Sequence, residues 1–294
     1  MKFIISSKAG GNLMSRKARK GKSVLPGFGL TMGITVAMLS VLVLIPLASV
    51  LVYAFHMSWK EFLELMMRPN VRQAFVTSVS CAFVAAVLNC VFGLVLAWVL
   101  VRYEFPGKRL MDGMIELPFA LPTAVAGITL SKMYSDEGIL GRLLGYIGIK
   151  ASYTKTGLTI ALVFIGIPFV VRALQPVLEK LPGTYEEAST MLGASRSYTF
   201  RRVILPELMP ALLTGFGLAL ARGIGEYGSV IYISGNSAKE GTQVVSYIIM
   251  QKLNSGNVDY EGAAAIALVL LLVSFFLLFL INMIQIAAGR RTKQ

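Results

Sequence analysis

Long apolar stretches, separated by short polar ones, run along nearly the whole chain. They occupy residues 28–55, 74–101, 110–134, 157–178, 208–233 and 263–287. A helix that crosses a bilayer needs about twenty mostly apolar residues, because all its backbone polar groups must be hydrogen-bonded within the segment. The pattern therefore predicts an all-α integral membrane protein with about six transmembrane helices. The third stretch is the least regular, since Glu116, Pro118 and Pro122 interrupt it.

The composition agrees with a membrane protein. Of the 294 residues, 55% are hydrophobic and 15% are charged, and the mean hydropathy is +0.70, whereas soluble domains carry about 25% charged residues. A net charge of +13 would suit nucleic acid, but the basic residues gather before the first stretch, after the second and fourth, and behind the sixth. The positive-inside rule then predicts a multi-pass membrane protein with both termini cytoplasmic, in contact with lipid and not with nucleic acid. The loop 132–155, with four basic residues, is the exception.

Little of the chain lies outside the membrane. We expect residues 1–27 to form a basic cytoplasmic segment, residues 28–287 a transmembrane domain and residues 288–294 a cytoplasmic tail. The first apolar stretch is longer than the roughly 7–15 residues of a signal-peptide core, so it should be retained. Met14 is a second candidate start. Cys81 and Cys90 fall within the second stretch and are interpreted as apolar packing residues.

The segment 181–206, between the fourth and fifth stretches, carries the most specific local pattern. Thr184 and Glu187 have the spacing of a capping box, which predicts the start of a short helix. Gly193 is expected to end it in the left-handed conformation. A basic run from Arg196 to Arg202 follows, and Leu205-Pro206-Glu207 is expected to open the next membrane helix.

This short helix should have an apolar face. Tyr185, Ala188, Met191 and Leu192 fall on one side of it. Such a face suits docking into a groove on a partner protein, and it equally suits a helix that lies in the lipid headgroups. The residues alone leave both interpretations open.

The spacing Glu187-Ala188-Ser189, three residues, Gly193, nine residues, then Val203-Ile-Leu-Pro206 resembles the EAA signature of permease subunits of ATP-binding-cassette (ABC) importers. Ser189 and Val203 are mild departures from that signature. The resemblance implies a type I ABC importer permease fold in which 181–206 is the coupling loop that docks on an ATPase subunit. It assigns this coupling role to Glu186, Glu187, Ala188, Ser189, Leu192, Gly193, Leu205 and Pro206.

Four further stretches, residues 102–107, 116–130, 167–177 and 222–228, resemble the T branch of the sulfate/thiosulfate permeases. The run Leu121-Pro-Thr-Ala-Val is closer to this branch than to its W paralogue. Molybdate permeases share the Arg-x-x-Gly-Glu-aromatic-Gly pattern of residues 222–228, so a molybdate or tungstate importer is the alternative.

The resemblance also implies that the chain lies in the bacterial plasma (inner) membrane, and it implies the partners of the chain. These are a W-like second permease that forms a heterodimer with it, two copies of an ABC ATPase, and a periplasmic or lipid-anchored sulfate/thiosulfate-binding protein. It implies no cofactor on this chain, because ATP and Mg would be bound by the partner ATPase.

Four ionisable residues fall at membrane depth, namely Glu116, Arg172, Arg222 and Glu226. Each should be paired, hydrated or functional, because an isolated charge at mid-bilayer costs about 2.5 kcal/mol or more. Arg172 is expected to extend to the cytoplasmic boundary near Gln175. Arg222 and Glu226 are spaced for a direct pair, which either only neutralises itself or also presents Arg222 to a passing anion. The candidate anion path consists of Arg222, Gly225, Glu226, Pro118, Pro122 and Thr123.

Other functional classes are less well supported. A metal site is not expected, since His56 is the only histidine. The same scarcity argues against a membrane enzyme, and no catalytic residue is assigned. Gly21-Lys22-Ser23 lacks the first glycine and the preceding strand of a phosphate-binding loop. A channel or a membrane anchor would not need a specific docking loop.

Overall fold

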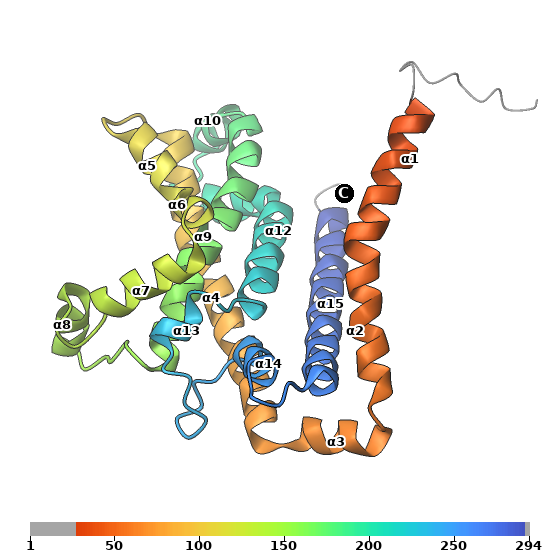
Figure 1. Ribbon diagram of the computed structural model, residues 1–294. Helices are drawn as coiled ribbons and strands as arrows, with labels where there is room; N and C mark the ends of the chain where they lie inside the picture. Colours follow the sequence, from red (N-terminus) through yellow and green to blue (C-terminus); the bar gives the residue numbers. More distant parts are fainter. Residues whose placement is uncertain (1–27, 292–294) are drawn as a thin grey trace, which may run out of the picture. The chain divides into compact units, whose positions relative to one another are not determined.

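The computed structural model describes residues 28–291, and every regular element within this range is a helix (Figure 1). The expected cytoplasmic segment 1–27, including Met14, lies outside the described residues. The chain divides into a first unit that ends at Ala48 and a second that begins at Ser49. In order, the helices are α1 (Phe28–Leu39), η1 (Ser40–Leu44), α2 (Ile45–His56), α3 (Trp59–Met67), α4 (Pro69–Arg102), α5 (Lys108–Ile115), α6 (Leu117–Ala120), α7 (Thr123–Met133), α8 (Ile139–Tyr146), α9 (Lys155–Lys180), α10 (Thr184–Met191), α11 (Arg196–Thr199), η2 (Phe200–Ile204), α12 (Leu205–Ile224), α13 (Val230–Ile233), α14 (Val245–Leu253) and α15 (Tyr260–Arg291).

The described part of the first unit is a single apolar helix that continues into the second. Helices α1, η1 and α2 form one run of 29 residues, with the π-helical turn η1 just before Pro46. A proline lacks the amide donor that the helical ladder needs, and a wider turn accommodates the gap. The side chains of α1 are exposed along its whole length. An apolar helix of this length with no polar face is a membrane span.

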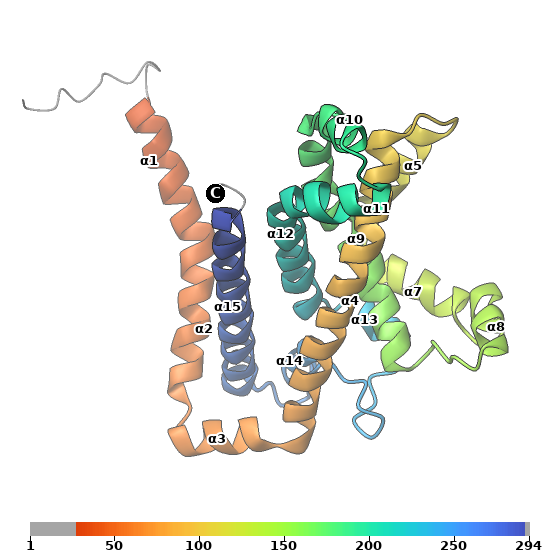
Figure 2. The ribbon, with the colours of Figure 1, turned by 180° about the vertical axis from the view of Figure 1, so that it is seen from behind.

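The core of the second unit is the packing of α4, α9 and α12, which Figure 2 shows side by side. Val170 of α9 lies between a glycine of α4 and a glycine of α12. A Cβ added at Gly93 would come within 2.7 Å of Val170 Cγ1, and one at Gly215 within 2.7 Å of Val170 Cα. Buried alanines of α4, among them Ala82 and Ala86, continue the contact. Small residues allow membrane helices to approach closely, and van der Waals contact then holds them together.

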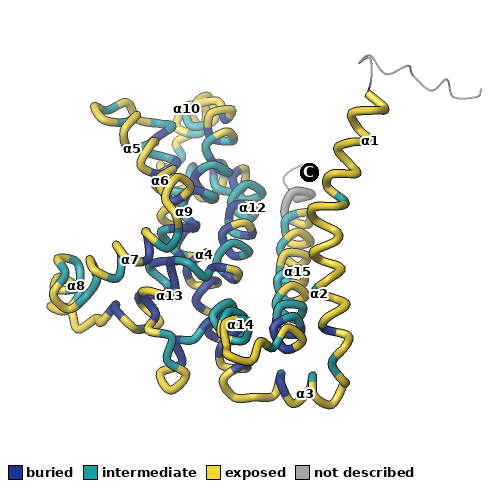
Figure 3. Tube along the Cα trace, in the orientation of Figure 1, coloured by how far each residue is buried: buried dark blue, intermediate teal, exposed yellow. Residues whose placement is uncertain are grey.

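Within residues 28–291, five helices are long and apolar enough to cross a membrane, which agrees with the expected multi-pass fold. They cover residues 28–56, 69–102, 155–180, 196–224 and 260–287. Figure 3 shows that α4, α9 and α12 bury one face, while α15 is exposed mainly in its second half. Apolar surface of this kind is covered by lipid or by another membrane subunit.

The third expected span, residues 110–134, is not one continuous helix. It is divided into α5, α6 and α7, with breaks at Glu116 and at Leu121–Pro122. Pro118 stands in the first turn of α6, and Pro122 immediately precedes α7, so each proline occupies a position where no helical donor is needed.

The fifth expected span, residues 208–233, also differs from the prediction. Helix α12 ends at Ile224, and α13 begins only at Val230. The break falls in a glycine-rich sequence, Gly223-Ile-Gly225-Glu-Tyr-Gly228, where the backbone loses most entropy on forming a helix.

Candidate functional site

The predicted coupling loop, residues 181–206, is a helix-turn-helix element. Helix α10 ends at Met191, and Gly193 takes the left-handed conformation with φ +80°, as expected. Ser195 then caps α11, its Oγ accepting the amide of Tyr198 at 3.3 Å. The predicted capping box is wrong. Thr184 is the first residue of α10, with Gly183 in helical conformation before it, so Thr184 is not placed to accept an amide of the first turn.

The predicted apolar face of α10 is exposed. Met191 is 90% and Leu192 87% accessible, and Tyr185 is 49% accessible. Beside this face is a hollow of about 620 Å³ whose lining includes Trp98, Glu186, Met191 and Phe200. Two large aliphatic side chains at this exposure form a surface that gains free energy when another protein or a membrane covers it.

Two side-chain contacts hold α10 in place. Glu186 forms an ion pair with Arg102, with 3.1 Å between the side-chain nitrogen and oxygen. Ser189, one of the departures from the EAA signature, bonds through its hydroxyl to the hydroxyl of the buried Thr199 at 2.7 Å. This bond joins α10 to α11, so the serine has a definite structural role here. Glu187 and Ala188 are exposed.

Helix α12 begins at Leu205 with Pro206 in its first turn, as predicted, but no break separates it from the helical turns before it. A continuous helix runs from Arg196 to Ile224, and its turn at Phe200–Ile204 is π-helical. The amide of Leu205 donates to the carbonyl of Phe200. This widened turn lies immediately before Pro206 and accommodates its missing donor.

The candidate anion path begins with a buried carboxylate. Glu226 is 1% exposed at its side chain and is hydrogen-bonded to Arg222, whose side chain is 36% exposed. Its other oxygen accepts the amide of Ser229 at 3.0 Å and the hydroxyl of the same residue at 3.1 Å. Gly225 lies between Arg222 and Glu226, directly after the end of α12. The network satisfies the carboxylate fully and leaves part of the Arg222 guanidinium accessible.

The two helix breaks meet at this network. Thr123 Oγ1 lies against the Cα of Gly228, and Gly127 lies against the backbone of Ser229, so neither glycine has room for a side chain. Helix α7 therefore packs on α13 at the point where Ser229 holds Glu226. Thr123 and the adjacent Pro122 are thus close to the Arg222–Glu226 pair.

Pro118 lies elsewhere. It is buried in α6, next to a separate hollow lined by Phe105, Met114, Phe164 and Ile167. The structure therefore does not group it with the other candidate path residues.

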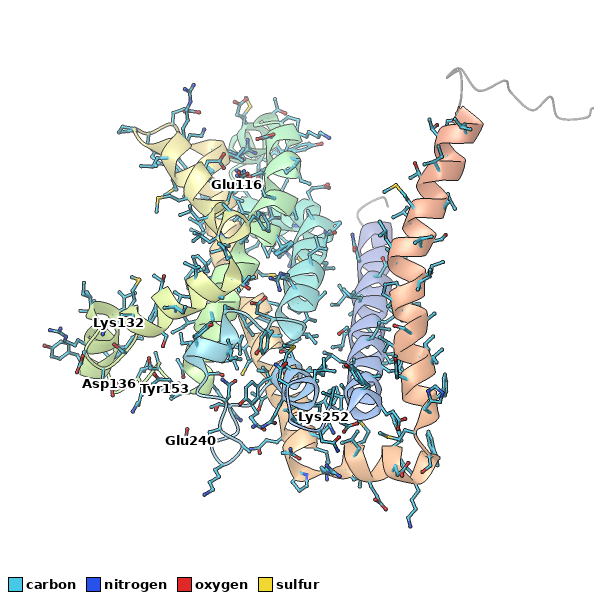
Figure 4. The ribbon with its side chains drawn as sticks, in the orientation of Figure 1. Glu116, Lys132, Asp136, Tyr153, Glu240 and Lys252 are labelled. Carbon is cyan, nitrogen blue, oxygen red and sulfur yellow. The ribbon has the colours of Figure 1, made fainter. Side chains whose placement is uncertain are left out.

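Arg172 lies beside Gln175, as expected, and it also contacts acidic side chains. It bridges two carboxylates of the broken segment, 2.8 Å from Asp112 Oδ1 and 2.7 Å from Glu116 Oε1, and also donates to Gln175 at 2.5 Å. Figure 4 labels Glu116 at the junction of α5 and α6. Asp112 is a functional residue that the sequence did not identify. What pointed to this cluster was the expectation that Arg172 and Glu116, both at membrane depth, each need a partner.

A second polar cluster precedes α15. Lys252, labelled in Figure 4, pairs with Asp259 at 2.6 Å, and the other Asp259 oxygen accepts the amide of Gly262 at 2.7 Å. Partial burial favours the neutral acid, but the hydrogen bonds from Lys252 and Gly262, with the positive charges of Lys252 and Arg68, outweigh it and hold the pKa of Asp259 below its usual value. The carboxylate caps the first turn of α15.

Among the residues that the structure describes, no group of three or more His, Cys, Asp or Glu side chains could hold a metal ion.

Comparison with known proteins identifies the family. Residues 89–291 match the family described as "Binding-protein-dependent transport system inner membrane component". The sulfate transport system permease protein CysT of Salmonella typhimurium strain LT2 is 46% identical over 93% of this chain and 98% of its own length. A bacterial ABC transporter that imports the acidic polysaccharide alginate has a similar fold, with a TM-score of 0.72 at 15% identity over 91% of this chain and 97% of that one.

The same alginate transporter has also been solved with an alginate-bound periplasmic protein, and there the TM-score is 0.72 at 14% identity over 87% of this chain and 92% of that one. These likenesses confirm the expected importer permease fold. The chain belongs to the binding-protein-dependent transport system inner membrane component family and, within it, to the CysT-type permeases.

Proposed function

We propose that this chain is the T-type permease subunit of an ATP-driven sulfate importer that also accepts thiosulfate. The observation that carries the proposal is the 46% identity to a sulfate permease along almost the full length of both chains. Members of the family are membrane components of transport systems, so the chain itself is not an enzyme. ATP and Mg would be bound and used by a partner subunit.

The exposed face of α10 supports the coupling role. Met191 and Leu192 are almost fully accessible, and the acidic Glu187 is exposed beside them. In an assembled importer this face would sit in a cleft of the ATPase. Burying two such side chains contributes about 1.5–3 kcal/mol each, enough to hold the loop in the cleft while the ATPase moves.

The remaining partners follow from the same proposal. A W-like permease would complete the path as a heterodimer, two ATPase copies would bind on the cytoplasmic side, and a periplasmic or lipid-anchored receptor would deliver the anion. The long exposed apolar faces of α1 and α15 offer surface for lipid and for the second permease. Both termini would be cytoplasmic.

For the anion path, we propose that Arg222 provides a positive charge along the path and that Glu226 fixes the orientation of its guanidinium. The buried carboxylate fixes one side of the guanidinium, and the accessible part of the same group would attract a dianion. Thr123, Pro122 and the glycine-rich break at Gly225 lie close by.

The transported anion can be tested in proteoliposomes that hold both permeases and the ATPase, with the binding protein added outside. We expect ATP-dependent uptake of labelled sulfate that excess thiosulfate inhibits and molybdate does not. Uptake of molybdate with no uptake of sulfate would contradict the proposal and favour the molybdate alternative.

The role of Arg222 is tested by rescue. The double variant Arg222→Gln, Glu226→Gln leaves no unpaired buried charge, so it should assemble with the ATPase normally. If Arg222 attracts the anion, this variant should still import sulfate poorly, whereas Arg222→Lys, which keeps the charge, should retain partial uptake. Full sulfate uptake by the double variant would eliminate Arg222 from the path.

A further inference from the structure

The last turn of α4 contacts both ends of the coupling loop. The Arg102 guanidinium pairs with Glu186 at 3.1 Å and donates to the carbonyl of Leu181 at 3.3 Å, at the start of the loop. One turn earlier, the Trp98 ring meets Phe200, near the end of the loop, edge to face with 5.6 Å between ring centroids. The two residues also contact each other, since the Arg102 Cζ lies 5.5 Å from the centre of the Trp98 ring.

These contacts are partly shielded from water. The side chain of Arg102 is 20% exposed, and both Trp98 and Phe200 pack on the hydrophobic core. An exposed ion pair alone would hold the loop only weakly. Here the pair is combined with a carbonyl contact and with the ring contact between Trp98 and Phe200, so the loop is held at two points by one turn of one helix.

The other end of α4 holds a second segment, residues 234–246, which we call the distal segment. Thr77 Oγ1 donates to the carbonyl of Gly241 at 2.8 Å, and Ser78 Oγ accepts the amide of Val245 at 3.0 Å. Both α4 side chains are buried. Glu240, labelled in Figure 4, marks the projecting part of this segment.

The distal segment reaches the candidate anion path. Ser246, directly after Val245, donates its hydroxyl to the carbonyl of Glu226 at 2.7 Å. Glu226 in turn holds Arg222. A continuous set of contacts therefore leads from the coupling loop through α4 and Ser246 to the Arg222–Glu226 pair.

Helix α4 is mechanically suited to join these sites. It runs unbroken from Pro69 to Arg102, with its proline in the first turn. From Thr77 to Arg102 it spans roughly 37 Å at 1.5 Å per residue. The helices joined covalently to the loop are less regular, since α9 contains Pro168 and Pro176, and α12 contains Pro210 and ends at Ile224. Prolines inside a helix weaken its hydrogen-bond ladder and bend it.

We propose that Trp98 and Arg102 are positioning residues for the coupling loop, and that α4 carries displacement of the loop to the distal segment and so to Glu226. The inference rests on the proposed function, because it requires the loop to move with the ATPase. It assigns to α4, a helix outside the loop, the role of linking movement of the loop to the conformation of the anion path.

The test uses the complete transporter in proteoliposomes, with the binding protein and sulfate outside. The variants are Trp98→Leu and Arg102→Gln at one end of α4, and Thr77→Val and Ser78→Ala at the other. Matched controls are Lys108→Gln, which removes the ion pair to Glu104 near the same end of α4, and Ser274→Ala, which removes a hydroxyl bonded within its own helix. ATPase co-purification, ATP hydrolysis and sulfate uptake are measured for each.

We expect every α4 variant to co-purify with the ATPase but to lose at least about fivefold in sulfate imported per ATP hydrolysed, the lower end of usual coupling effects. The controls should match the unmodified chain. Both ends of α4 act in the same chain of contacts, so breaking one end already interrupts it. The ratio of sulfate imported to ATP hydrolysed in Arg102→Gln combined with Thr77→Val should therefore fall no further than in the worse single variant.

Two results would overturn the inference. One is a ratio of sulfate to ATP within about twofold of the unmodified chain in Trp98→Leu and Thr77→Val, two uncharged changes chosen in case Arg102→Gln does not assemble. The other is independent, multiplicative losses in the double variant. Failure of the proposed function is a separate result, seen as absence of ATPase co-purification or of sulfate uptake with the unmodified chain.

Discussion

Replacing Gly193 tests the coupling loop at its most constrained backbone position. Gly193 has φ +80°, and a Cβ added there would meet no heavy atom within 4 Å. Alanine or valine would therefore have room, and the penalty would come from the backbone conformation alone. For a residue other than glycine this amounts to about 1–2 kcal/mol, more for a β-branched side chain. The left-handed turn would then be disfavoured by a factor of about 5–30.

The consequence for docking follows from the geometry. Without this turn α11 would leave α10 in a different direction, so Met191 and Leu192 would no longer keep their position relative to Arg196 and α11. The hydroxyl bond between Ser189 and Thr199 opposes this change and recovers part of the loss. We expect a graded series in which asparagine, which tolerates the left-handed region, is mildest, alanine intermediate and valine most severe.

The assay compares ATPase co-purification and sulfate uptake with the amount of chain in the membrane. Both activities should fall together while insertion stays normal. Gly183→Ala is the matched control, because Gly183 is in the same loop, has φ −60° and also has open space around it. If Gly193→Val binds ATPase and imports sulfate as well as Gly183→Ala, the loop does not dock through this turn.

Three further predictions address other parts of the chain. A reporter fused to either terminus should be accessible only from the cytoplasm, and one inserted at Lys239 only from outside; the reverse pattern would refute the predicted orientation. Ser189→Ala should cost about 1 kcal/mol of loop stability, seen as faster proteolysis between α10 and α11, and Ser197→Ala is its exposed control. The stability that the Asp259 carboxylate contributes should be fully present above the usual aspartate pKa and be lost as the pH falls through its lowered pKa. Asp259→Asn should therefore lose less thermal stability on acidification than the unmodified chain. The same dependence of thermal stability on pH in both proteins would contradict the pairing.

The regular spans are predictable because a bilayer imposes a length and a composition on them. Residues 74–101, 157–178 and 263–287 fall within α4, α9 and α15. Hydropathy cannot distinguish a continuous helix from short helices that cover the same depth, which is why the breaks at Glu116 and Leu121 were not predicted as breaks. The prolines nevertheless marked their position, since each stands where a helix starts.

Within the site, local geometry was more predictable than tertiary contacts. The left-handed Gly193 follows from the need of a helix to end, and the Arg222–Glu226 pair follows from helical spacing. The partners of Arg172 lie 56 and 60 residues away in sequence. The sequence indicates that Arg172 and Glu116 each need a partner, but it does not indicate which distant residues meet. The capping box at Thr184 matched in spacing but not in position, because α10 starts one residue too early for it.

The position of Val170 between Gly93 and Gly215 limits how sequences of this kind can diverge. The three residues determine the space available to one another, since three helices meet at this point. A side chain at position 93 would meet the side chain of Val170, so it is tolerable only if residue 170 becomes smaller in the same lineage. A side chain at position 215 would meet the backbone of Val170, which no substitution at 170 removes. Divergence at this contact should therefore proceed by paired substitutions at 93 and 170, while glycine is retained at 215 among functional descendants.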